Sequence, residues 1–194
     1  MVAENTVRKI LITGGMRSGK SAFALELARG WPANKLFLAT AQSSDPEMES
    51  RIEKHKKERS PDFQTIEEPI DLGNVIKREG GLKKLIIIDC LTLWINNLLF
   101  TLEKNKKARE EKKQLFLENV QETESSLIVI TNEVGWGVIP DNALGRLYVE
   151  ELGLINRQMA LCCSEMYLMV AGLPQRLKPV DQSIQKMRLR KVYE

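Results

Sequence analysis

Residues 14–21 read GGMRSGKS and match the pattern GxxxxGK[ST], in which a glycine-rich loop wraps its backbone around a chain of phosphates. An apolar run precedes the motif at Lys9–Thr13, and a helical pattern follows at Ser18–Arg29. The loop therefore has a strand before it and a helix N-terminus after it, as phosphate binding requires. Lys20 is expected to reach the β- and γ-phosphates, and the Ser21 hydroxyl is expected to bind Mg²⁺. The motif predicts a site for a nucleoside triphosphate with magnesium.

The rest of the chain alternates short β-rich runs with amphipathic stretches. The predicted strands are Lys9–Thr13, Lys35–Ala39, Leu85–Asp89, Leu127–Thr131 and Met166–Ala171. Predicted helices follow them at Ser18–Arg29, Pro46–Arg59, Leu91–Leu102, Lys106–Glu124 and Asn142–Ser164. Three of the strands are continuous apolar runs, which is typical of strands covered on both faces. The predicted fold class is α/β, a P-loop NTPase-like three-layer domain with a mostly parallel central sheet.

Composition and charge limit the function classes. The 194 residues are 43% hydrophobic and 28% charged, which predicts one globular domain over residues 1–178 and a basic tail at 179–194. The net charge of +3 comes from the C-terminal end, so the body is formally neutral and a nucleic-acid partner is not expected. No apolar run is long enough to span a membrane, and the first ten residues, MVAENTVRKI, lack a hydrophobic signal core. We therefore expect a cytoplasmic protein, in which Cys90, Cys162 and Cys163 form no disulfide framework.

A phosphate-binding loop of this kind works with a carboxylate that holds magnesium from the end of a neighbouring strand. Leu85–Asp89 reads LIIID, four apolar residues followed by an acid, and supplies that group. The predicted metal ligands are Ser21 and Asp89. Polar residues also follow two other strands, at 40–42 and 131–135, and mark the edge of the sheet where ligands bind.

The only histidine, His55, lies in the basic stretch RIEKHKKER at 51–59. Helical spacing places Arg51 and Arg59 on the same face, and the surrounding positive charge disfavours the imidazolium, so the ring is expected to be neutral near pH 7. A neutral imidazole is a nucleophile, and cations around it suit a phosphate substrate. The residues alone leave two interpretations open: a catalytic nucleophile, or a solvated side chain on a charged helix.

Together these motifs resemble one family, the bifunctional adenosylcobinamide kinase and adenosylcobinamide-phosphate guanylyltransferase of cobalamin biosynthesis. The resemblance covers about residues 8–178. The stretches that carry it are GGMRSGKS at 14–21, ATAQ at 39–42, the D-x-E-M-x-x-R-I-x-x-H pattern at 45–55, NNLLF at 96–100, TNEVGWGVIP at 131–140 and GLINRQMA at 153–160.

The resemblance implies two reactions at one site. ATP or GTP phosphorylates the aminopropanol hydroxyl of adenosylcobinamide, and GTP then transfers GMP through a histidine to that phosphate, giving adenosylcobinamide-GDP and pyrophosphate. It implies that His55 is the guanylylated nucleophile and Lys20 the second catalytic residue. The implied nucleotide contacts are Gly14, Gly15, Met16, Arg17, Ser18, Gly19, Lys20, Ser21, Ala39, Thr40, Ala41, Lys56, Lys57, Glu58, Arg59, Glu67 and Asp89. It also implies Mg²⁺ as cofactor, a corrinoid and nucleotides as the small-molecule partners, and a homotrimer.

Three other functions fit parts of the sequence. A monofunctional small-molecule kinase would use Lys20, Ser21 and Asp89 but has no need of His55. A GTPase switch usually carries an NKxD motif after a strand, and the nearest string here is NKKA at 105–108. A nucleic-acid-dependent ATPase would need a basic face, which the neutral body does not predict.

The packing of two further segments is also predicted. The apolar residues Trp94, Leu98, Leu99 and Phe100 are expected in the core rather than at a subunit interface. The charged run Glu103–Lys113 is expected to be a solvated helix end. After the fourth strand, Asn132 and Glu133 either line the corrinoid site or form a structural turn, and the residues leave both possibilities open.

Overall fold

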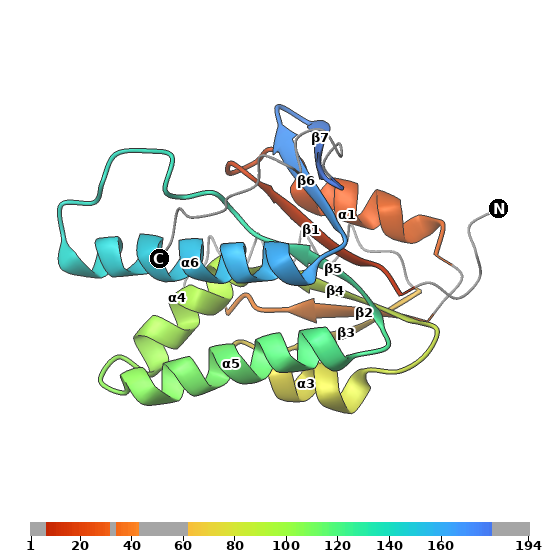
Figure 1. The fold of residues 1–194 in the computed structure, drawn as a ribbon, viewed down its shortest axis with the longest axis horizontal. Coiled ribbons are helices and arrows are strands. Elements are labelled where there is room, and N and C mark those ends of the chain that lie inside the picture. Colours follow the sequence, from red (N-terminus) through yellow and green to blue (C-terminus); the bar gives the residue numbers. More distant parts are fainter. Residues whose placement is uncertain (1–6, 32–33, 43–61, 180–194) are drawn as a thin grey trace.

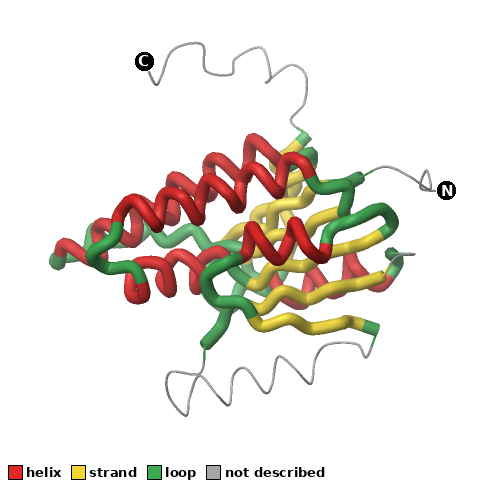
Figure 2. Tube along the Cα trace, turned by 90° about the horizontal axis from the view of Figure 1, so that it is seen from below, coloured by secondary structure: helices red, strands yellow, loops and turns green. Residues whose placement is uncertain are grey.

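In the residues that the computed structural model describes (7–31, 34–42 and 62–179), seven strands form one sheet in the order β3-β2-β4-β5-β1-β6-β7 (Figures 1 and 2). Neighbouring strands are parallel, except that β6 and β7 form an antiparallel hairpin at one edge. The strands are β1 (Lys9–Gly14), β2 (Asn34–Ala39), β3 (Phe63–Glu67), β4 (Lys84–Asp89), β5 (Ser126–Ile130), β6 (Glu165–Val170) and β7 (Leu173–Lys178).

Helices cover both faces of this sheet, because the central strands are apolar on both sides. One face packs against α1 (Lys20–Arg29), through a cluster that includes Ile12, Ala24 and Ile87. The other face packs against four helices, through a cluster that includes Leu11 and Trp94. These are α3 (Leu72–Glu79), α4 (Leu91–Thr101), α5 (Lys106–Glu122) and α6 (Ala143–Cys162). The predicted three-layer α/β architecture is confirmed.

The described elements agree closely with the sequence prediction. All five predicted strands are present with ends that differ by one residue, and four of the predicted helices are present with ends that differ by one or two. The predicted helix at Pro46–Arg59 and the tail at 179–194, apart from Pro179, lie outside the described residues. No helix in the described part of the chain combines the length and apolar character that crossing a membrane needs.

Three elements escaped prediction, each for a physical reason. Strands β3 and β7 form the two edges of the sheet, and their sequences FQTIE and LPQRLK carry polar side chains that are mostly exposed. Edge strands need only one paired side, so they lack the continuous apolar pattern that identifies buried strands. Helix α3 has only eight residues and begins with the sequence LGN. The helix is too short, and its first turn too poor in helix-forming residues, to be recognised from the sequence.

Two predictions about packing were partly wrong. Trp94, Leu98 and Leu99 lie in the core as expected, but Phe100 is 66% exposed. The run Glu103–Lys113 is not entirely a solvated helix end, because Arg109 and Lys113 are buried. Arg109 donates to two backbone carbonyls at the end of α4.

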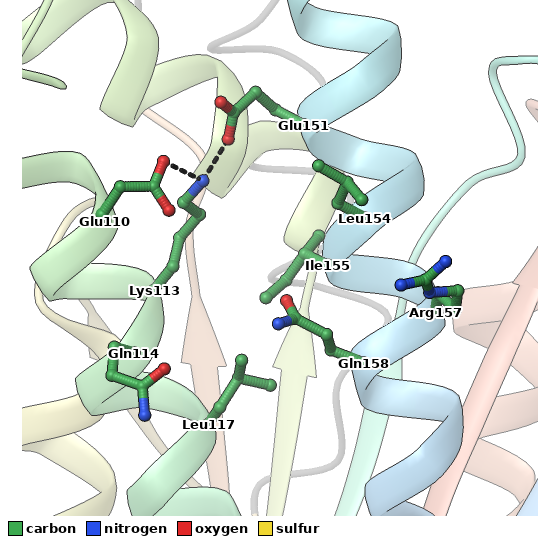
Figure 3. Close-up of a pocket in the computed structure, with 9 residues that line it drawn as sticks. All are labelled: Glu110, Lys113, Gln114, Leu117, Glu151, Leu154, Ile155, Arg157 and Gln158. Atoms are coloured by element: carbon green, nitrogen blue, oxygen red, sulfur yellow. Dashed lines mark hydrogen bonds and ion pairs between the residues drawn. The ribbon is translucent and has the colours of Figure 1, made fainter. Parts of the chain in front are cut away.

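The burial of Lys113 depends on a partner distant in sequence. Its ammonium lies between the carboxylates of Glu110, on α5, and Glu151, on α6, as Figure 3 shows. The pocket drawn there, lined by residues of α5 and α6, lies at the junction of these two helices. A charge pattern read along α5 alone could not predict this ion pair, because the Glu151 side chain is supplied by tertiary packing.

Close helix packing makes one glycine structurally necessary and leaves another dispensable. A methyl group at Gly73 on α3 would lie 2.9 Å from backbone atoms of Leu115 and Phe116 on α5, whereas one at Gly153 on α6 would meet no atom within 4 Å. We expect Gly73→Ala to lower the free energy of unfolding by about 1–3 kcal/mol through overpacking. Gly153→Ala should raise it by about 0.5–1 kcal/mol through helix propensity. Urea unfolding followed by circular dichroism tests both, and stabilisation by Gly73→Ala would contradict the packing argument.

Candidate functional site

The residues predicted to bind nucleotide meet at one edge of the sheet. Strands β4, β5 and β1 are adjacent and parallel, so the segments that follow them lie side by side at their carboxyl ends. These segments are the loop at 14–19, Asp89 with Cys90, and residues 131–133. The topology therefore brings together three groups that are widely separated in the sequence.

The phosphate-binding loop has the backbone conformation that its glycines allow. Gly14 ends β1 with φ 146°, Arg17 has φ 56°, and Gly19 precedes α1 with φ 95°. A side chain at Gly14 would also collide with the carbonyl oxygen of Met169 on β6, 2.5 Å from the position of its Cβ. Both the dihedral angles and the close contact require glycine at this position. Gly15, Met16 and Arg17 form the exposed tip of the loop.

Lys20 is folded back over this loop. Its side chain is buried, and its ammonium donates to the carbonyl oxygens of Gly14 at 3.2 Å and Gly15 at 2.5 Å and to Ser18 Oγ at 3.4 Å. The positive charge of the Lys20 ammonium therefore lies beside the loop and near the N-terminus of α1, which also attracts anions. This arrangement suits an anion such as a β-phosphate.

The hairpin β6–β7 supports the loop from the other side, which the sequence did not predict. The backbone N–H of Gly172, in the turn between the two strands, donates to the carbonyl of Ser18 at 3.1 Å. A Cβ at Gly19 would lie 3.4 Å from the Gly172 Cα, so the turn and the loop are in close contact. The only sequence signal for this contact is the pair Ala171 and Gly172 after a strand, and both adopt positive φ.

The predicted metal ligands are in contact. Ser21 Oγ donates to Asp89 Oδ2 at 3.0 Å, which joins the start of α1 to the end of β4. A hydroxyl and a carboxylate are the hard oxygen ligands that Mg²⁺ prefers, so this pair fits a magnesium ion whose remaining ligands are water and phosphate oxygens. Within the described ranges, no group of three or more His, Cys, Asp or Glu side chains is placed to hold a metal ion.

Thr40 follows β2 and fixes the segment that carries Asp89. Its side chain is fully buried, and its hydroxyl donates to the Cys90 carbonyl and accepts from the Cys90 N–H, both at 2.8 Å. The Thr40 N–H donates to the Asp89 carbonyl at 3.1 Å, and Asn97 donates to the Thr40 carbonyl at 2.8 Å. The hydroxyl of Thr40 therefore points into the protein, and Ala41 is the half-buried residue that follows it.

Three residues predicted to contact the nucleotide lie side by side on adjacent strands of the sheet. Ala39 pairs with Asp89 on one side and with Glu67 on the other, so all three lie at the carboxyl edge. Glu67 is exposed at the end of β3. His55 and the four residues after it, Lys56, Lys57, Glu58 and Arg59, lie outside the described residues.

The buried cysteines have no nucleophilic role at neutral pH. Burial is the main cause that raises the pKa of Cys90 to about 11, and the charge of Asp89 adds to it. Burial likewise raises the pKa of Cys163 to about 12. Both thiols are therefore protonated at pH 7, and a thiol needs to be deprotonated to act as a nucleophile.

Comparisons with known proteins point to one family of enzymes. A family model described as cobinamide kinase / cobinamide phosphate guanyltransferase matches residues 10–177. The chain is 38% identical over 168 residues to the bifunctional adenosylcobalamin biosynthesis protein CobP of Pseudomonas aeruginosa, covering 87% of this chain and 96% of that protein. It is 32% identical over 180 residues to the bifunctional adenosylcobalamin biosynthesis protein CobU of Escherichia coli, covering 87% of this chain and 99% of that protein.

Solved structures with a similar fold are distant in sequence. One solved ATPase domain has a TM-score of 0.50 at 12% identity and covers 83% of this chain and 68% of that chain. A protein from Pyrococcus horikoshii OT3 has a TM-score of 0.52 at 9% identity, covering 91% of this chain and 89% of that chain. At these identities the likeness concerns the fold alone, and it agrees with the predicted P-loop NTPase-like class.

The hydrogen bonds of Thr40 generate a testable prediction. Thr40→Val keeps the shape of the side chain but leaves the buried N–H and C=O of Cys90 without their partner, so we expect the free energy of unfolding to fall by about 1–3 kcal/mol. Thr40→Ser keeps the hydroxyl and should cost only about 0.8 kcal/mol for the lost methyl group. Urea unfolding compares the two variants. Equal stabilities would mean that the hydroxyl does not hold this segment.

Proposed function

The chain belongs to the cobinamide kinase / cobinamide phosphate guanyltransferase family, and we propose that the edge formed by β1, β4 and β5 performs both of its reactions with one nucleotide site. Such a protein is a bifunctional kinase and guanylyltransferase. The observation that carries the proposal is the meeting of Lys20, Ser21 and Asp89 beside the glycine-rich loop. The substrates are adenosylcobinamide, with ATP or GTP for the first reaction and GTP for the second.

In the kinase step, the loop binds the triphosphate and the acceptor hydroxyl attacks it. The backbone N–H groups of residues 14–19 hold the β-phosphate, and Lys20 exchanges the carbonyls of Gly14 and Gly15 for phosphate oxygens. A bond forms between the acceptor oxygen and the γ-phosphorus while the bond to the bridging oxygen breaks, and the nucleoside diphosphate leaves. Because most of the catalysis is positioning and charge neutralisation, a rigid cationic loop is the main requirement.

Ser21 and Asp89 would hold Mg²⁺ beside the β- and γ-phosphates, since their oxygens already meet at 3.0 Å. When bound, the ion neutralises charge on the transferring phosphate and on the leaving group. The hydrogen bond between the two side chains keeps both oxygens at the same corner of the site. Thr40 supports this corner through the backbone of Cys90.

In the guanylyltransferase step, His55 attacks the α-phosphorus of GTP and pyrophosphate leaves. The terminal phosphate of adenosylcobinamide phosphate then takes the GMP, which frees the histidine. Splitting the displacement into two steps conserves the activated guanylyl group. Arg17 and Lys20 stabilise the departing pyrophosphate. The remaining nucleotide contacts follow the family resemblance: Ala39, Thr40, Ala41, Lys56, Lys57, Glu58, Arg59 and Glu67.

The protein is proposed to be cytoplasmic, as expected from its sequence, and to be a homotrimer, as the family resemblance implies. Exposed apolar side chains such as Phe100 and Leu144 supply surface that subunit contacts could cover.

The histidine assignment predicts a covalent intermediate. Incubation with [α-³²P]GTP should label the protein with GMP in an acid-labile, base-stable bond, and mass spectrometry should locate the adduct on His55. His55→Ala should lose the label and keep kinase activity. Lys20→Met should lose both, because both reactions need the triphosphate. An unlabelled wild-type protein that retains kinase activity would support the monofunctional kinase instead.

The metal assignment predicts a specific magnesium dependence. Asp89→Asn keeps the shape but removes the charge, so we expect the Mg²⁺ concentration for half-maximal kinase rate to rise at least about tenfold. Asp89→Glu retains the carboxylate and should be affected less. Rates measured over a Mg²⁺ titration test this, and chelation with EDTA should abolish activity in every variant. A curve for Asp89→Asn that matches the wild-type curve would assign the metal to other ligands.

A further inference from the structure

Glu133 is a carboxylate at the edge of the sheet, and the sequence alone left open whether it lines the corrinoid site or belongs to a structural turn. We propose that Glu133 is a catalytic residue of the kinase step, which holds the acceptor hydroxyl of the corrinoid in line with the γ-phosphate and takes its proton. The proposal rests on the proposed function, because it assumes that the glycine-rich loop binds the phosphoryl donor.

The sheet order places Glu133 between the two halves of the nucleotide site. Strand β5 has β1 and the glycine-rich loop on one side and β4 with Asp89 on the other. The backbone N–H of Glu133 donates to the Gly14 carbonyl at 3.4 Å, and the same carbonyl accepts from Lys20 at 3.2 Å. Glu133 and the lysine expected at the β- and γ-phosphates therefore share one backbone acceptor.

The side chain of Glu133 is oriented by a buried threonine. Thr13 Oγ1, on β1, donates to Glu133 Oε1 at 2.8 Å, and the Thr13 side chain is 1% exposed. Among the described residues, no hydrogen bond to Glu133 Oε2 is found. One carboxylate oxygen is thus fixed by the protein, and the other is available to a substrate hydroxyl.

The segment that carries Glu133 is rigid rather than a loose loop. Thr131 donates to the side chain of Asn156 on α6 at 2.7 Å, and Asn156 donates to the Asn132 carbonyl at 3.0 Å. Asn132 in turn donates to Thr92 on α4 at 2.9 Å. These bonds hold both residues that precede Glu133, so its backbone is held before any substrate arrives. Such preorganisation is what a catalytic group requires.

The other predicted carboxylates of this edge are less suited to the task. Asp89 is joined to Ser21 as the expected metal pair. Glu67 ends β3, three strands away from β5, which corresponds to about 14 Å at the usual strand spacing. Beyond Glu133 the chain continues in an exposed stretch, with Trp136 70% and Val138 96% exposed, so a bulky acceptor can approach from this side.

The proposed step is an ordinary phosphoryl transfer. The acceptor oxygen forms a bond to the γ-phosphorus, and its proton passes to Glu133 Oε2. The bond between the γ-phosphorus and the bridging oxygen breaks, and its electron pair leaves with the nucleoside diphosphate. Water then takes the proton from Glu133. General base catalysis of this kind contributes about 10²–10⁴-fold to the rate.

The isosteric variant Glu133→Gln tests the proposal, because the amide oxygen still accepts from Thr13. Three quantities are measured: kinase kcat and KM for the corrinoid, nucleotide affinity, and the yield of GMP adduct with GTP. We expect kcat to fall about 100-fold or more, with nucleotide affinity changed less than about twofold and the adduct unchanged, since neither involves the acceptor hydroxyl. Glu150→Gln, an exposed site on α6, is the matched control and should behave as wild type.

Two results would overturn the assignment of Glu133. One is full kinase activity in Glu133→Gln, and the other is an equal loss of kinase activity, nucleotide affinity and adduct, which would indicate a structural role beside the loop. A wild-type protein without kinase activity would instead contradict the proposed function. Thr13→Val adds a second check: it should lower kcat in the wild-type background and have little further effect in Glu133→Gln, because the two residues act as one unit.

Discussion

The backbone of Gly14 is the point on which the rest of the site depends. Its carbonyl oxygen accepts from the Lys20 ammonium and from the Glu133 N–H, and its φ of 146° turns the chain from β1 into the loop. Met169 on β6 leaves no room for a side chain there. One residue without a Cβ therefore joins three strands to the phosphate site, and any side chain at this position would disturb all of them.

The proposed site has a phosphate side and a metal side, and different elements hold each of them. The loop is supported by the β6–β7 hairpin through the Gly172 N–H. The metal side is supported by β2, because Thr40 binds both backbone groups of Cys90 beside Asp89. The hydrogen bond between Ser21 and Asp89 joins the two sides. Hydrogen bonds to the backbone thus fix the positions of the loop and of the segment that carries Asp89.

This division explains how one nucleotide site can serve two chemistries. In the proposed mechanism, both reactions begin with a triphosphate whose β-phosphate lies in the same loop, so the loop, Lys20 and the proposed metal ligands Ser21 and Asp89 are common to both. The two proposed mechanisms differ in the attacking group, which is an acceptor hydroxyl in the kinase step and an imidazole in the guanylyltransferase step. The buried cysteines remain protonated at pH 7 and offer no competing nucleophile.

The sequence by itself determined the features that depend on local pattern. Five strands, the loop at 14–21 and Asp89 could be predicted because apolar runs and glycine spacing act over a few residues. The edge strands β3 and β7, the burial of Lys113 and the contacts of Glu133 could not, because each depends on a partner far along the chain. Only the strand order β4-β5-β1 brought Glu133 beside Gly14 and Asp89 beside Ser21. A parallel sheet brings together segments that are far apart in the sequence, and neither segment contains a local pattern that identifies its partner.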